Sequence, residues 1–450
     1  MRQPEIIDRR IFFKTALAGV AGYFASPLRL PAQTFFASVP DPPLMGTAKN
    51  VIFILMAGAP SQVDTFDLKV GPWTPDNFNP TTINGIDFPV GLLPGISQQL
   101  HHISVVRSMQ STALVHPLLQ TWTQIARNPT SATGKIAPNI GSIVALETEP
   151  QRRSDQPLPG FVSLNTGGRV HKQGYLPGRY SPFDTVAEQE GLSNLINPAG
   201  EDLFTARFEM LQLLDARNRL QSQYGTTLDE MHDFYSSGRR MMYEPRVSEA
   251  FQFSDTEAER YGGTGLGNSC IVAKNILKSD LGTRYIQINS GGWDNHQDIY
   301  LEGAGLYARA AEMDPALSNL IDDLANTPGS AGKTLLDETL IVAKGEFGRT
   351  VGALTSRAGR DHYFVHFALF AGGGTVGGRI VGQTTADGRF IENPGWSAYR
   401  PATAEDVAAT IYSATGINYK TVRTDDPLGR GFPYVPSVPW QGTPITELFQ

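Results

Sequence analysis

Runs of consecutive apolar residues, without polar alternation, punctuate the chain and predict buried strands. The clearest run covers residues 51–56 and stops at Gly58. A strand with no polar positions is expected where helices cover both faces of a sheet. Shorter runs predict four further strands, over residues 103–106, 285–288, 339–343 and 366–370.

Helical periodicity appears between and after these strands. Residues 305–324 repeat apolar positions at helical spacing between the third and fourth strands, and residues 403–415 do so near the end of the chain. A strand–helix–strand order implies a right-handed crossover and a mostly parallel sheet. Residues 66–98 and 372–402 are rich in Gly, Pro and Asn and are expected to form loops. The fold predicted is α/β, with a mostly parallel sheet flanked by helices.

A charged helical stretch, at about residues 201–278, separates the second and third predicted strands. Phe204, Phe208, Leu211 and Leu214 form one apolar stripe along its first helix. We interpret the stretch as a helical insertion packed against the sheet, and its stripe as part of the core rather than as a docking face.

The first residues have the pattern of a twin-arginine export signal. Arg9 and Arg10 precede a short, Gly-containing apolar run at residues 15–25. An ordinary amphipathic helix is the alternative, and the run is too short for a membrane span, which needs about 20 apolar residues. We therefore expect a signal segment at residues 1–32 and a linker at 33–47. The remaining residues, 48–450, are then a single α/β domain.

Composition narrows the possible partners. The chain is 40% hydrophobic and 10% aromatic, which excludes a disordered protein. Its net charge is −7, or −10 without residues 1–32, and such acidity argues against nucleic acid as a ligand. No apolar run in the expected mature chain is long enough to cross a membrane. Cys270 is the only cysteine, so thiolate metal clusters are excluded, and it is expected to be inert packing.

Carboxylates and imidazoles follow several predicted strands. Asp294 and His296 come after two glycines, Glu346 follows the strand at 339–343, and Asp361 and His362 are adjacent. Ligands of open α/β sheets gather beyond the carboxyl ends of the strands, so these side chains predict a divalent metal centre. Mixed oxygen and imidazole donors suit zinc, manganese, iron or calcium. Asp294 has an alternative role as a helix N-cap.

Other residues extend this candidate set. Asp64 lies after the first strand and is either a metal ligand or part of a turn, and His116 follows the second strand but, as a lone His, can equally be structural. Arg349 either pairs with Glu346 or holds a tetrahedral anion. Neither a Gly-Xaa-Ser-Xaa-Gly elbow nor a phosphate-binding glycine loop is present, and no helical pattern follows the glycines at 372–378 to support a dinucleotide site.

Several of these motifs together resemble a bacterial family known as domain of unknown function 1501, which is similar to sulfatases and alkaline phosphatases. The likeness rests on residues 58–67, 107–109 with His116, 291–296, 345–350 and 359–362, followed by a glycine loop at 371–374, and it spans about residues 48–430. A twin-arginine leader is common in that family.

The resemblance implies a sheet flanked by helices and a pair of metals. Asp294 and His296 look like the Asp and His of one metal site, and His362 like its later His. Glu346 stands where the other site would have an adjacent Asp-His pair, although Phe347 replaces the His. The sulfatase signature is absent, and the candidate nucleophiles are Ser61, Thr65 and Ser108, of which Ser61 is preferred.

Two functional hypotheses follow from the sequence. The first is an exported, periplasmic or secreted, metal-dependent hydrolase of phosphate or sulfate esters, with a small-molecule or glycan substrate and the twin-arginine machinery as its export partner. The second is a non-catalytic secreted protein on the same fold, in which a metal stabilises the loops and the surface binds a glycan or another partner.

Overall fold

The computed structural model describes residues 43–220, 226–437 and 442–450. The predicted export signal and most of the predicted linker lie outside these residues, and both stay predictions.

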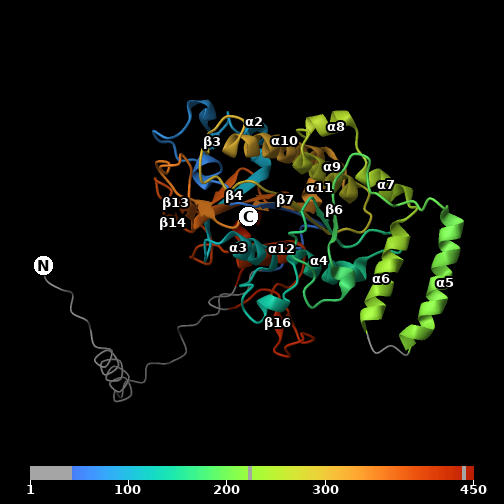
Figure 1. The fold of residues 1–450 in the computed structure, drawn as a ribbon. Coiled ribbons are helices and arrows are strands. Elements are labelled where there is room, and N and C mark those ends of the chain that lie inside the picture. The colour runs from blue at the N-terminus through green and yellow to red at the C-terminus, as the bar shows by residue number, and fades with distance from the viewer. Residues whose placement is uncertain (1–42, 221–225, 438–441) are drawn as a thin grey trace, which may run out of the picture. The chain divides into compact units, whose positions relative to one another are not determined.

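An eight-stranded sheet forms the centre of the described fold (Figure 1). All strands of this sheet are parallel except β11, which pairs antiparallel with β4 and β8. The five predicted strands and the mostly parallel arrangement are therefore confirmed. Across the sheet the order is β12 (Arg379–Val381), β4 (Ile103–Gln110), β11 (Val365–Ala371), β8 (Thr339–Lys344), β1 (Asn50–Met56), β7 (Tyr285–Ser290), β5 (Phe161–Leu164) and β6 (Phe183–Thr185).

The central strand β1 explains why its sequence lacks alternation. All seven of its residues are buried. Ile52 and Ile54 belong to the hydrophobic core on one face of the sheet, whereas Phe53 and Leu55 belong to the core on the other face. Each large apolar side chain buried in this way contributes roughly 1.5–3 kcal/mol. Both faces of the sheet are therefore packed interiors.

Two helical layers cover these faces (Figure 1). α9 (Gly265–Lys278) and α10 (Gly305–Asn326) contribute to one core, and α4 (Ile140–Thr148) and α12 (Ala404–Ala414) contribute to the other. The two predicted helices correspond to α10 and α12. Cys270 of α9 is fully buried, as expected for packing, and its burial raises the pKa of its thiol to about 12.

Two parts of the prediction were incomplete. Residues 66–98 and 372–402 were expected to be loop, but the first range contains two short strands and a short helix, and the second contains β12, which joins the edge of the sheet beside β4. β5 and β6 were not predicted because runs of three or four residues give little periodicity.

The remaining helices and short strands are β2 (Pro80–Ile83), β3 (Ile86–Pro89), α2 (Pro94–Gln98), α3 (His116–Ile125), α7 (Pro245–Phe251), α8 (Asp255–Arg260), α11 (Leu335–Glu338), β9 (Gly348–Arg349), β10 (His362–Tyr363), β13 (Gln383–Thr384), β14 (Ile391–Asn393), β15 (Val422–Arg423) and β16 (Phe432–Pro433).

The insertion is helical as predicted, but its first helix does not belong to the core. α5 (Glu201–Leu220) lies beside α6 (Thr226–Met241) at one edge of the described fold, with α5 outermost (Figure 1). Leu211 and Leu214 are 37% and 64% exposed. The prediction that this stripe is core was wrong, because α9 and α10 already cover the neighbouring face of the sheet.

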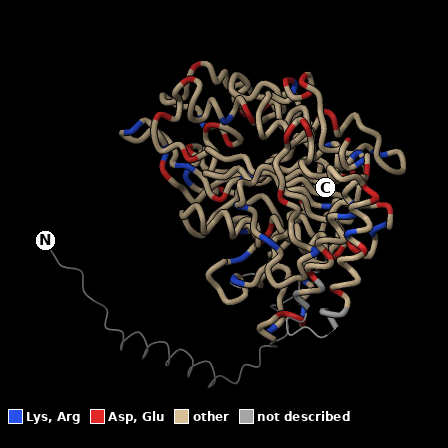
Figure 2. The backbone as a smooth tube through the Cα atoms, turned by 45° about the vertical axis from the view of Figure 1, so that its right-hand side comes forward, with Lys and Arg blue, Asp and Glu red and all other residues tan. Residues whose placement is uncertain are grey.

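Charged residues of both signs are interspersed along the described chain (Figure 2). The expectation that nucleic acid is not a ligand rests on net charge and stays a prediction. Within the described residues, no helix has the length and apolar character needed to cross a membrane.

Candidate metal centre

The direction of the strands brings the predicted motifs to one side of the sheet, where the parallel strands have their carboxyl ends. β1, β4, β7 and β8 run parallel, so the loops that follow them leave at the same edge. β11 runs the opposite way, so the segment that precedes it arrives at this edge too. His362 therefore reaches the loops that follow β7 and β8, although His362 precedes β11 in the chain. The two-residue ladder of β9 and β10 pairs His362 with Arg349.

Two glycines allow the loops to approach one another. Gly58 has a φ of +109°, and a Cβ atom there would lie 2.6 Å from the backbone nitrogen of Asp294. A Cβ atom at Gly359 would lie 2.1 Å from the carbonyl carbon of His296. Both distances are too short for any side chain, so these positions need glycine. The β1 loop and the loop before β10 can consequently lie directly against residues 294–296.

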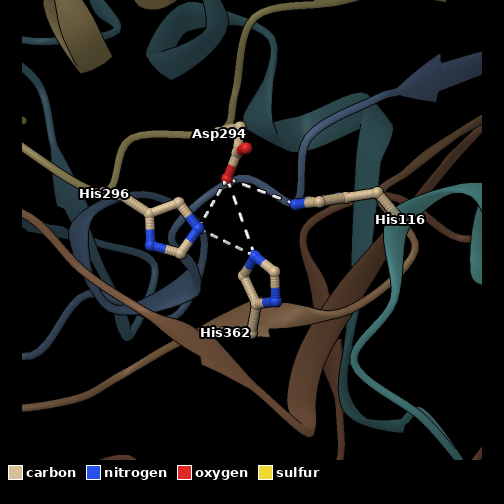
Figure 3. A group of neighbouring side chains, drawn as sticks. All are labelled: His116, Asp294, His296 and His362. Atoms are coloured by element: carbon tan, nitrogen blue, oxygen red, sulfur yellow. Dashed lines mark hydrogen bonds and ion pairs between the residues drawn. The ribbon is translucent and has the colours of Figure 1, made fainter.

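Four side chains converge at this place (Figure 3). His116, Asp294, His296 and His362 each offer one ligand atom, and these atoms all lie within 4.8 Å of one another. Asp294 Oδ1 is 3.2 Å from His116 Nε2, 3.1 Å from His296 Nε2 and 3.7 Å from His362 Nε2. Ligand atoms bound to one metal at about 2.0–2.2 Å have separations of this size.

Each imidazole is held from behind through its other nitrogen. His116 Nδ1 lies 2.6 Å from Glu346 Oε1, and His296 Nδ1 lies 2.7 Å from Asp361 Oδ1. His362 Nδ1 lies 3.0 Å from the carbonyl oxygen of Leu114. All three partners are acceptors, so each Nδ1 carries the proton and donates it. Metal-binding histidines are oriented by such bonds to carboxylates or backbone carbonyls.

This arrangement leaves unshared electron pairs directed at one another. A neutral imidazole with a proton on Nδ1 has a lone pair on Nε2. His296 Nε2 and His362 Nε2 are 2.9 Å apart, and the buried His116 Nε2 has no hydrogen-bond partner. The anionic oxygen of Asp294 faces the same point. A cation or added protons must relieve this repulsion, so the donor set fits a divalent metal.

Burial and neighbouring charges shift the pKa values of His116, His362 and Asp294. Burial lowers the pKa of His116, but the hydrogen bond and charge of Glu346 outweigh burial and raise it overall. Burial also lowers the pKa of His362, and the charge of Arg349 and the protonated forms of His116 and His296 add to the effect. For Asp294, burial raises the pKa, but Arg349 more than compensates and holds it below its ordinary value. Asp294 is therefore ionised at neutral pH.

Arg349 acts on the centre through Asp294. Its Nη2 donates to Asp294 Oδ1 at 2.5 Å and to the carbonyl oxygen of Gly58, and its Nε and Nη1 donate to the carbonyl oxygens of Ala59 and Arg360. The side chain is 1% exposed. The sequence hypothesis that Arg349 holds a substrate anion is not supported by this placement, because every nitrogen of the guanidinium already has a protein acceptor.

Glu346 supports a ligand rather than joining the cluster. Its Oε1 accepts from the backbone nitrogen of Gly58 and from Gln120 Nε2 as well as from His116. The carboxylate is completely buried, and its Oε2 has no hydrogen-bond partner. Asp361, which is half exposed, occupies the corresponding position behind His296. These two predicted ligands therefore orient the histidines and do not belong to the four-residue cluster.

Asp64 and Ser61 belong to a separate buried network. Asp64 accepts from Arg360 at 2.7 Å and from Ser61 Oγ at 2.6 Å, and Tyr300 also donates to it. Because its two oxygens are engaged, Asp64 is not brought to the metal cluster as the sequence hypothesis expected. Ser61 is 2% exposed, and its hydroxyl donates to Asp64. Ser61 is therefore poorly placed to act as a nucleophile.

The other candidate hydroxyls also have partners elsewhere. Thr65 Oγ1 donates to the carbonyl of Ser61, and Ser108 Oγ donates to that of Pro394. Sequence reasoning missed the orienting role of Leu114, which no side-chain pattern reveals because the acceptor is a backbone carbonyl. It noted Phe347 only as the replacement of an expected His and missed its packing, in which the ring centroid lies 4.6 Å from those of both His116 and His362. That aromatic packing fixes the two imidazoles from the protein side.

Fold and site together define an α/β protein with a three-histidine, one-aspartate centre at the edge of a mostly parallel sheet. The chain belongs to the family described as "Protein of unknown function (DUF1501)", whose model matches residues 48–449. The resemblance inferred from the motifs is thereby confirmed. A comparison with curated proteins found no match. The metal pair implied by the wider resemblance is not evident, since the described residues form one such cluster.

The solved structures with a remote likeness include a member of the alkaline phosphatase superfamily and two enzymes. A superfamily protein of Vibrio parahaemolyticus is 10% identical with a TM-score of 0.38, over 83% of this chain and 67% of that one. The lipoteichoic acid synthase of Listeria monocytogenes is 12% identical with a TM-score of 0.37, over 89% and 78%. The phosphonate monoester hydrolase of Agrobacterium radiobacter is 10% identical with a TM-score of 0.37, over 89% and 77%. Likeness at this level says nothing about chemistry.

Proposed function

We propose that the protein is an exported, metal-dependent hydrolase of phosphate or sulfate esters. The observation that carries this proposal is the convergence of three oriented imidazoles and one ionised carboxylate on a single point. Three nitrogen donors and one oxygen donor favour zinc, manganese or iron over calcium, which prefers oxygen ligands. Such a metal polarises an ester oxygen and lowers the pKa of bound water.

Access to the centre supports a catalytic role. The side chains of Asp294 and His296 are 47% and 31% exposed, whereas the residues that orient the site from within, Arg349 and Glu346, are buried. A rigid, buried support beneath an open face is what a reacting centre requires. Small-molecule or glycan esters can reach such a face, and residues 1–32 would direct the protein to the periplasm or outside the cell through the twin-arginine machinery.

The number of protein ligands also favours the second hypothesis, a non-catalytic protein stabilised by its metal. Four protein ligands complete a tetrahedral shell, as in structural zinc sites, whereas catalytic zinc sites retain an open position. Each candidate hydroxyl nucleophile is bonded elsewhere, so hydrolysis here would depend on water activated directly at the centre. A metal that binds only the folded protein would then contribute chiefly to stability.

A substrate panel on metal-defined protein separates the two hypotheses. The purified chain is stripped with a chelator, reloaded with zinc, manganese or iron(II), and assayed with aryl phosphate, phosphodiester and sulfate esters. The first hypothesis expects turnover that returns with one metal and is absent from His362→Ala. If every loaded form is inactive, while chelation and His362→Ala both lower the melting temperature, the second hypothesis holds instead. His101→Ala, an exposed histidine outside the cluster, is the control.

A further inference from the structure

A small, mostly polar pocket lies between helix α6 and the body of the chain. Its volume is about 130 Å³. Arg240 and Ser237 of α6 line it on one side, and Glu149 and Arg152, which follow α4, also contribute to its lining. A further lining residue, Gly160, directly precedes β5, which runs parallel to β7. The pocket therefore lies at the amino end of β5, at the opposite end of the strands from the metal centre.

Two guanidinium groups in this pocket have no carboxylate partner. Arg152 donates from Nη2 to the backbone carbonyl oxygens of Gln156, at 2.5 Å, and of Leu158. Arg240 donates from Nη2 to Ser237 Oγ at 2.8 Å. Within the described part of the chain, Nε and Nη1 of both side chains have no acceptor. Each guanidinium therefore keeps N–H donors for a ligand.

The charges that line the pocket do not balance. Arg152, Arg179 and Arg240 carry three positive charges, and Glu149 and Asp233 carry two negative charges. Asp233 lies 3.6 Å from Arg179, which leaves Glu149 to offset both other arginines. Burial lowers the pKa of Arg152, and the charge of Arg240 lowers it further against the opposing charge of Glu149. Arg152 and Arg240 therefore repel each other, and an anion between them would relieve this repulsion.

We propose that this pocket binds one tetrahedral oxyanion, phosphate or sulfate, between Arg152 and Arg240. Guanidinium groups bind such anions through pairs of parallel N–H donors. The hydroxyl of Ser237 accepts from Arg240 and can donate its own proton to the anion. A volume of about 130 Å³ has room for one such group but not for a chain of sugars.

The anion is either free in solution or the ester group of a phosphorylated or sulfated sugar, since both present the same oxygens. Arg240 belongs to the helical insertion and Arg152 to the body of the sheet, so a bound anion joins the two. The pocket contains none of the residues of the metal centre. The inference is therefore independent of the proposed hydrolysis.

Calorimetric titration of the full chain with inorganic phosphate, at constant ionic strength, tests the proposal. We expect one site with a millimolar or tighter dissociation constant. Arg240→Gln removes a guanidinium from an exposed position near the end of α6 and should weaken binding at least about tenfold, as the loss of charge-assisted hydrogen bonds does. Circular dichroism checks that the variants keep their helices.

Arg239→Gln is the matched control. Arg239 is the neighbouring residue of the same helix, but it lines a different pocket, together with Phe204 and Phe208 of α5. Because its side chain does not reach the anion, the substitution should change the dissociation constant by less than about twofold.

Glu149→Gln should have the opposite effect to Arg240→Gln. It removes a negative charge from the lining of the pocket and should tighten phosphate binding at least about threefold, because the carboxylate repels the anion. Tighter binding after loss of an acid is specific to an anion site, and a merely structural role of these side chains does not predict it.

Two further titrations assign the site and its ligand. An anion can also bind a metal, so the titration is repeated with His362→Ala, in which phosphate binding should persist. Glucose 6-phosphate then distinguishes the two sources: equal or weaker binding identifies the free anion as the ligand, and tighter binding identifies the ester group of a sugar.

Three results would overturn the proposal. The first is that inorganic phosphate, inorganic sulfate and glucose 6-phosphate all fail to bind. The second is that phosphate binding disappears in His362→Ala, which would assign the anion to the metal centre. The third is that Arg240→Gln and Arg239→Gln weaken binding equally.

Discussion

Arg349 holds Asp294 in place, at a donor–acceptor distance of 2.5 Å, from a position that solvent does not reach. This makes Arg349 part of the framework of the centre, since the same guanidinium ties together the loops after β1 and β8 and the loop before β10. We expect Arg349→Lys to lower the free energy of unfolding by about 2–3 kcal/mol, because an ammonium cannot reproduce the planar set of bonds. Urea denaturation measures the change.

The exposed Arg357 provides the comparison for that substitution. It lies 3.6 Å from Asp361, beside the centre, but is 61% exposed. Arg357→Lys should therefore change the free energy of unfolding by less than about 0.5 kcal/mol. Equal effects of the two substitutions would contradict the framework role of Arg349.

Glu346→Gln should weaken metal binding without unfolding the protein. The amide keeps the size of the buried side chain but loses the charge that accepts the proton of His116. Loss of such an orienting partner costs about 10–100-fold in metal affinity. Competition with a chromophoric chelator measures the affinity.

Asp361→Asn makes the same chemical change behind His296 at a half-exposed position. Its effect on affinity should be smaller, because water replaces the lost interaction in part. If neither variant binds metal more weakly than the wild type, the carboxylates do not orient the ligands.

Gly58→Ala should disturb both stability and metal binding. The added Cβ would lie 2.6 Å from the backbone nitrogen of Asp294, in a conformation with φ of +109°. We expect a loss of about 1–3 kcal/mol and a lower affinity for metal, because the ligand loop must move. Gly46→Ala is the matched control, since Gly46 also has positive φ but has open space around its Cβ direction. A Gly46 variant as damaging to metal binding as Gly58→Ala would argue against the contact as the cause.

Asp323 should stabilise the fold in a pH-dependent way. It accepts from Arg260 and from Tyr261 at 2.7 Å and lies 3.1 Å from Lys274, which together join α8, α9 and α10. Burial raises the pKa of Asp323, but these donors outweigh burial and lower it below 3.8. The stabilisation is thus complete above the unfolded pKa and is lost as the pH falls through the lower, folded pKa.

We expect Asp323→Asn to cost about 1.5–3 kcal/mol at neutral pH, with the difference from the wild type shrinking once the pH falls below about 3.8. Urea denaturation at several pH values tests this. Asp322→Asn, at the exposed neighbouring position, should have little effect at any pH. A cost for Asp323→Asn that does not change with pH would show that its charge is irrelevant.

The sequence predicted five strands of the sheet because each contains a mostly apolar run of four to six residues. It failed where local pattern is uninformative. α5 has an apolar stripe that looks like core, but whether such a stripe faces the sheet or the solvent depends on which helices already cover the sheet. The three-residue β6 and the edge strand β12 are stabilised by pairing with their neighbours rather than by periodicity.

The sequence predicted the kinds of residue at the candidate site, but not which of them form the cluster and which orient its histidines. Asp294, His296, His362 and His116 converge, whereas Glu346 and Asp361 lie one step behind them. A carboxylate after a strand can bind a metal or orient a histidine that does, and the choice depends on distances of a few ångström. That information lies in the packing of α3 against the loop after β8, which no local motif encodes.

The reversed direction of β11 has a consequence for how the protein matures. His116 is available early in synthesis, but His362 reaches the other ligands only when a strand from the last quarter of the chain has been inserted between β4 and β8. A nascent or truncated polypeptide that ends before this strand lacks the pairing that brings His362 to the other three ligands. A metal that needs all four ligands would therefore be bound tightly only after the sheet is complete.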